Sequence, residues 1–224
     1  MTPEGHRGDD MTDVSEAYHE AGHAVASYLS GRGIRRVSIV ATDDAAGHVL
    51  RYSRGQKWLD ALEEADYEYG HGKFINSSTR RSVEIEIMVS MAGGLTEMEA
   101  LGLEDDLSPG TALIPYTAEQ RAGLAFRTGD APDDLVHLCG DYEFVSILAE
   151  KVSGSLDEAN AYILWLEQRT RNLIRHPWFM PAVHALAQAL TERKTLSGRE
   201  VRTTIDAAIE AAFPVPKEWL GAPK

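Results

Sequence analysis

The most restrictive feature of this sequence is the stretch AYHEAGHAV at residues 17–25, which carries His19, Glu20 and His23. Residues four apart lie one above the other on a helix face, so in a helix the two imidazoles can hold one zinc ion. Glu20 lies about 100° around the helix from its neighbour, within reach of a water on that ion. The pattern predicts a zinc site with Glu20 as general base. The alternative is a pair of packed histidines.

A helix around this stretch follows from its hydrophobic pattern. Apolar residues recur at three- and four-residue steps from Val14 to Leu29, which indicates one buried stripe. Asp13 or Ser15 can cap the start, and the glycines at 31–33 end the helix. The small residues between the histidines leave room for a metal and a close neighbour. The histidines are therefore expected in the middle of a packed helix.

The rest of the chain is mostly helical in its patterns, with few strands. We expect a disordered tail at 1–12, one domain at 13–213 and a proline-rich tail at 214–224. The expected strands are 36–40 and 48–52, followed by helices at 81–101, 118–126, 141–153, 156–175, 178–194 and 198–212, with a turn at 195–198 in which Ser197 caps the last helix. The fold class is α+β, mostly α, with a small sheet of two or three strands.

A glycine pair, Gly93-Gly94, lies inside the expected helix at 81–101. Glycine costs roughly 1 kcal/mol in a helix interior. We therefore expect another group to pack very close to the backbone at this point.

Composition excludes several classes of function. The formal net charge is −13, from 35 acidic and 22 basic side chains, which argues against binding to nucleic acid or an anionic membrane surface. The N-terminus is polar and acidic, unlike a signal peptide, and no apolar stretch approaches the ~20 residues of a membrane span. A single cysteine, Cys139, fits a reducing compartment. We expect a cytoplasmic protein without a membrane anchor.

Three blocks of the sequence resemble the peptidase domain of the FtsH family, the membrane-anchored AAA+ zinc proteases. AYHEAGHAVASYL followed by RRVSIV resembles the metal-binding motif, and VSMAGGLTEMEALG resembles the glycine-pair helix. ALAQALTERKTLSGREV resembles the C-terminal block of the family. The blocks occur in the family's order and cover most of residues 14–205. The resemblance implies a zincin-like helical peptidase domain that acts on a peptide or flexible protein substrate.

The sequence also departs from that family. It has no phosphate-binding loop of the GxxxxGK[ST] type and none of the family's ATPase or transmembrane segments. We expect a free-standing relative that cannot use ATP on its own. Substrates are then already flexible, or a separate ATPase partner unfolds them; assembly into a homo-oligomer stays open.

A catalytic zinc usually has a third protein ligand besides its water. In the resembling family this ligand is an Asp that opens a later helix, and two positions here look similar. Asp141 is favoured over Asp106, because the proline and glycine at 109–110 break any helix after Asp106. Asp141 could instead be a plain helix cap. A ligand from the 81–101 helix, Glu97 or Glu84, would resemble a different class of zinc peptidase.

The predicted function is a zinc metalloendopeptidase in which His19, His23 and Asp141 hold Zn²⁺ and Glu20 is the general base. One alternative is a hydrolase of small amides with the same zinc chemistry. Another is a non-proteolytic, zinc-binding helical interaction or adaptor protein. The strand at 37–40 is either an edge that pairs with an extended substrate or an ordinary structural strand.

Overall fold

The computed structural model describes residues 7–41, 47–52, 75–102 and 141–214, and every structural statement below concerns these residues. They form six helices and three short strands, which confirms the α+β, mostly α, class. The elements are α1 (Arg7–Leu29), β1 (Ile34–Ser38), β2 (His48–Arg51), α3 (Ser77–Leu101), α7 (Asp141–Val152), α8 (Leu156–Ile174), α9 (Phe179–Arg193), β3 (Thr195–Ser197) and α10 (Gly198–Ala212).

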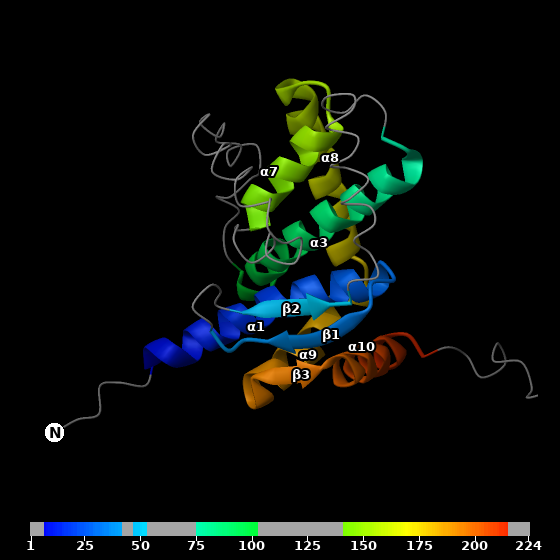
Figure 1. Ribbon diagram of the computed structural model, residues 1–224. Coiled ribbons are helices and arrows are strands. Elements are labelled where there is room, and N and C mark those ends of the chain that lie inside the picture. Colours follow the sequence, from blue (N-terminus) through cyan, green and yellow to red (C-terminus); the bar gives the residue numbers. More distant parts are fainter. Residues whose placement is uncertain (1–6, 42–46, 53–74, 103–140, 215–224) are drawn as a thin grey trace, which may run out of the picture.

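Helix α1 lies at the centre of the fold. Figure 1 shows α3 on one side of α1, with α7 and α8 beyond it, and the sheet with α9 and α10 towards the other side. Small side chains make this possible: Ala17, Ala21 and Ala24 are fully buried. At Gly22 an added Cβ would lie only 2.6 Å from the carbonyl oxygen of Ala92, so the backbones of α1 and α3 are close together. Gly22, one of the small residues between the histidines, thus lies where the two helices approach each other.

The sheet is antiparallel with the strand order β2-β1-β3. Val37 of β1 pairs with Val49 on one side and with Leu196 on the other. Val37 and Leu196 are buried, and so is Ser38, whereas Arg36 and the residues on either side of Leu196 are exposed. The interpretation of 37–40 as an edge strand is wrong, because β3 occupies the other side of β1. The residues of β3 were expected to form a turn.

Helix boundaries differ most at the N-terminal ends. Helix α1 begins at Arg7, so residues 7–12 are helical and do not belong to the expected tail. Helix α3 begins four residues before the expected start, because the side chain of Asn76 accepts a hydrogen bond from the Thr79 amide, at 2.9 Å.

The C-terminal helices agree with expectation within one or two residues. Ser197 caps α10 in a capping box with Glu200, as predicted for the cap. Directly after it, Gly198 packs on β1: an added Cβ would lie 2.8 Å from the carbonyl carbon of Ile34 and closer still to its oxygen. The tail residues 1–6 and 215–224, and the expected helix at 118–126, lie outside the described residues.

None of the described helices is both long and apolar enough to cross a membrane.

Candidate metal centre

Two helices bring the predicted metal ligands together. His19 and His23 lie on α1, and Asp141 is the first residue of α7. Oδ2 of Asp141 is 3.0 Å from Nε2 of His19 and 3.0 Å from Nε2 of His23, and the two Nε2 atoms are themselves 3.0 Å apart. The three atoms thus form a triangle with equal sides. In a tetrahedral zinc site with Zn–N of about 2.0 Å, two ligand atoms lie roughly 3.3 Å apart, which is close to these separations.

The outer nitrogens of the two rings determine which atoms face the triangle. Nδ1 of His23 donates to the carbonyl oxygen of Val89 at 2.8 Å, since a carbonyl can only accept. Nδ1 of His19 lies 3.0 Å from a carboxylate oxygen of Glu97, which is also an acceptor. In their neutral forms both rings therefore direct the lone pair of Nε2 at the carboxylate of Asp141. Three acceptors that converge without a donor between them fit a bound cation.

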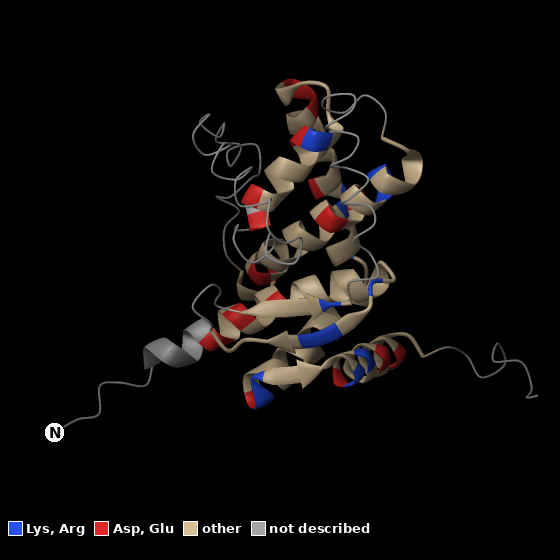
Figure 2. Cartoon of the chain, in the orientation of Figure 1, with Lys and Arg blue, Asp and Glu red and all other residues tan. Residues whose placement is uncertain are grey.

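The charges around the triangle favour positive charge at its centre. Burial by itself lowers the pKa of His19, but its hydrogen bonds to Asp141 and Glu97 outweigh this and raise that pKa to about 10. Asp141 likewise outweighs burial and raises the pKa of His23. The two histidines hold the pKa of Asp141 below its usual range in spite of burial. Figure 2 shows acidic residues gathered where α1, α3 and α7 meet. Protons or a divalent metal ion can supply the positive charge that these groups favour.

Glu20 is buried beside the histidines, with only 4% of its surface exposed. One carboxylate oxygen lies within 4.8 Å of a ring nitrogen of each histidine, and Oε2 has no hydrogen-bond partner among the described residues. Burial raises the pKa of Glu20 to about 7, against the opposing effect of the histidines. A buried carboxylate oxygen without a partner is costly. Such an atom suits a site in which a water or substrate group completes the hydrogen bonding.

Gly93, the first glycine of the pair in α3, lies directly against this site. A Cβ at Gly93 would lie 2.5 Å from Cε1 of His23 and closer still to its Nε2. This confirms the expectation of a close neighbour, and it identifies that neighbour as the imidazole of His23.

Two alternative candidates for the third ligand, Glu97 and Glu84, do not face the triangle. Glu97 contacts the outer nitrogen of His19 and does not face the triangle. Glu84 accepts a hydrogen bond from the Tyr162 hydroxyl at 2.7 Å, away from the cluster. Asp106 lies outside the described residues. Sequence reasoning missed the contact of Glu97 with His19, although Glu97 follows Gly93 by four residues and so shares its helix face.

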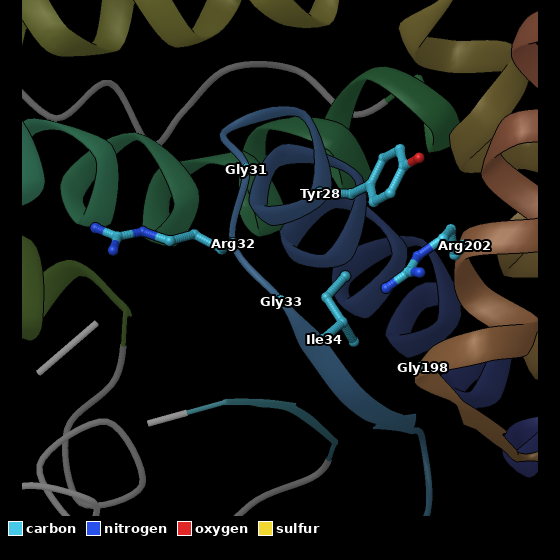
Figure 3. Close-up of a pocket in the computed structure, with 7 residues that line it drawn as sticks. All are labelled: Tyr28, Gly31, Arg32, Gly33, Ile34, Gly198 and Arg202. Carbon is cyan, nitrogen blue, oxygen red and sulfur yellow. The ribbon is translucent and has the colours of Figure 1, made fainter. Parts of the chain in front are cut away.

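A pocket of about 210 Å³ lies elsewhere, past the C-terminal end of α1. Figure 3 shows it between the turn after α1, the start of β1 and α10. Its lining residues are Tyr28, Gly31, Arg32, Gly33, Ile34, Gly198 and Arg202. No member of the histidine cluster lines it, so the pocket is separate from the metal centre.

Comparison with known proteins gives one similarity that bears on this centre. No family model matches the chain. The chain is 26% identical over 210 residues to the ATP-dependent zinc metalloprotease FtsH of Acidimicrobium ferrooxidans. The match covers 89% of this chain and 28% of that protein, so the chain spans less than a third of the length of its relative. Over most of its length, this protein is therefore similar to a part of a zinc metalloprotease.

Proposed function

We propose that this protein is a zinc metallopeptidase that hydrolyses peptide bonds in flexible peptides or proteins. The observation that carries the proposal is the triangle of His19, His23 and Asp141 with the unpartnered carboxylate of Glu20 beside it. The three residues of the triangle would hold the zinc through two imidazole nitrogens and one carboxylate oxygen. Two nitrogens and one oxygen form a donor set typical of catalytic zinc, which keeps a further position for water or substrate.

Zinc bound there supplies Lewis acidity, which polarises a carbonyl group and lowers the pKa of a water molecule towards about 7. The protein supplies the proton transfers. Glu20 accepts a proton from the attacking water through its unpartnered oxygen and delivers it to the leaving amine. Burial of Glu20 keeps bulk water from competing for that oxygen.

The choice of a peptide substrate is supported by the similarity to a metalloprotease over 89% of the chain. A hydrolase of small amides would use the same residues, so the substrate must be tested directly. The relative is an ATP-dependent protease, and this chain matches only 28% of its length. We propose that the metal centre hydrolyses flexible substrates without ATP, because the proton transfers described above do not involve a nucleotide.

The test compares zinc content and hydrolysis for the wild type, Glu20→Gln and Asp141→Ala. The substrates are casein and a mixed peptide library. We expect about one zinc per chain in the wild type and in Glu20→Gln, because Glu20 is not a ligand. Hydrolysis should fall about 10²–10⁴-fold in Glu20→Gln, since glutamine cannot accept the proton. Zinc should be lost from Asp141→Ala.

Glu99→Gln is the control, because Glu99 is exposed on α3 and lies two residues after Glu97, on the other side of the helix. Full activity in Glu20→Gln would contradict the assignment of the general base. Equal zinc in the wild type and Asp141→Ala would remove Asp141 from the ligand set. Cleavage of small amides without cleavage of casein or peptides would favour the small-amide hydrolase. Bound zinc with no hydrolysis at all would favour the adaptor protein.

A further inference from the structure

We propose that Glu97 is a positioning residue of the metal centre, which holds the imidazole of His19 with Nε2 towards the metal and thereby strengthens zinc binding. This inference rests on the metal-binding part of the proposed function and does not depend on the substrate.

The two histidines are held in different ways. The side chain of His23 is 11% exposed, bonds to a backbone carbonyl of α3 and lies against Gly93. The side chain of His19 is 25% exposed. Its outer nitrogen bonds to Glu97 at 3.0 Å. Packing and backbone thus fix His23, whereas a carboxylate side chain fixes the outer nitrogen of His19.

A second contact holds Glu97 itself. The hydroxyl of Ser15 donates to Oε1 of Glu97, while Oε2 receives the bond from His19. Ser15 and His19 are four residues apart on α1 and so lie on one face of the helix. Glu97 therefore bridges two successive turns of α1 from its place on α3. The side chain has both oxygens engaged on the same partner helix, which restricts its rotation.

The carboxylate of Glu97 affects the proton position and the basicity of His19 as well as its packing. It keeps the proton of neutral His19 on Nδ1, so Nε2 presents its lone pair to a metal. A charged acceptor makes a stronger hydrogen bond than a neutral carbonyl and increases the basicity of the ring. Removal of such an outer partner typically lowers metal affinity 10–100-fold. The basicity of His23 is not increased in this way, because its partner is the uncharged carbonyl of Val89.

The experiment measures the zinc dissociation constant by competition with a chromophoric chelator at one fixed pH. The variants are Glu97→Ala, the nearly isosteric Glu97→Gln and Ser15→Ala, with Glu99→Gln as the control on the same helix. The absorption spectrum of the Co²⁺-substituted protein reports whether the ligand set is unchanged. Denaturant unfolding of the metal-free proteins separates an effect on the site from an effect on the fold.

We expect zinc affinity to fall 10–100-fold in Glu97→Ala and by a smaller factor in Glu97→Gln, which keeps an acceptor but loses the charge. Ser15→Ala should shift affinity in the same direction by less. Affinity within twofold of the wild type in Glu97→Ala would overturn the proposal. So would a Co²⁺ spectrum showing that Glu97 is itself a ligand. A wild type that binds zinc without hydrolysing peptides would refute the peptidase and leave this inference standing. A wild type that binds no zinc would refute both.

Discussion

At two glycines of this molecule, neighbouring elements approach each other very closely, and the two contacts have different roles. Where α10 meets β1, Gly198 lies against the backbone carbonyl group of Ile34. Where α3 meets α1, Gly93 lies against the imidazole of His23. In each place a Cβ would enter the space of its neighbour. The first neighbour is backbone in the middle strand of the sheet, and the second is the end of a side chain that can rotate.

The comparison separates the parts of the sequence that maintain the fold from those that maintain the site. A backbone carbonyl in a paired strand cannot move without breaking the sheet, so the space over Gly198 is a requirement of folding. An imidazole can turn away at modest cost, but it then leaves the triangle with His19 and Asp141. The space over Gly93 is therefore a requirement of the proposed metal site. A substitution at Gly198 should therefore destabilise the fold, whereas a substitution at Gly93 should weaken binding at the proposed metal site.

The largest effect is expected from Gly198→Ala. The added methyl must displace α10 from β1, because no side chain there can yield. Overpacking of this kind costs typically 1–3 kcal/mol and occasionally more, and we expect a loss of about 3 kcal/mol in the free energy of unfolding. Chemical denaturation of the metal-free protein measures it. A loss below about 1 kcal/mol would show that α10 can shift on β1 at little cost, which would contradict the role of Gly198 in folding.

Gly93→Ala should leave the fold largely intact and damage the site. Alanine gains up to about 1 kcal/mol of helix propensity over glycine, which offsets part of the steric cost. The methyl pushes the ring of His23 out of the triangle, so we expect zinc affinity to fall at least about tenfold. Chelator competition and denaturation are measured on the same sample. A large loss of stability with unchanged zinc affinity would reverse the assignment of the two glycines.

The smallest effect is expected from Ser197→Ala, next to Gly198. This variant removes the capping box of α10 but adds no atom to the contact with β1. Loss of such a cap costs typically about 1 kcal/mol. Thermal and denaturant unfolding should therefore place Ser197→Ala between the wild type and Gly198→Ala. A cost equal to that of Gly198→Ala would mean that the cap, and not the close approach, controls how α10 docks.

The sequence predicted most of the fold because local signals mark its helices. The C-terminal helices have clear hydrophobic periods and turn residues between them. Strand β3 was missed because its three residues resemble a turn, and only the pairing with β1 makes them a strand. The start of α1 was also missed, since a polar segment rich in Asp and Gly is typical of a disordered tail, although Asp is also common in the first turn of a helix.

The site residues also differ in how they can be predicted: some are placed by a single helix, and others by the packing of distant segments. The spacing of His19, Glu20 and His23 predicts their common helix face from one helix alone. Asp141 was favoured through the resemblance to a family, and the structure brings it within 3.0 Å of both rings. The contact of Glu97 with His19 depends on how α3 is rotated against α1. The carbonyl of Val89 could not be foreseen, because every residue carries the same group.

The distance between Asp141 and the histidines along the chain has a consequence for how the protein matures. His19 and His23 meet as soon as α1 forms, which is a local event on the microsecond scale. Asp141 is 122 residues from His19, so it arrives only after a long loop has closed. Until then a zinc ion would find two ligands, and after that three. Under the proposed function, metal loading would therefore be a late step of folding, and the first sign of unfolding would be the escape of the metal as α7 separates from α3.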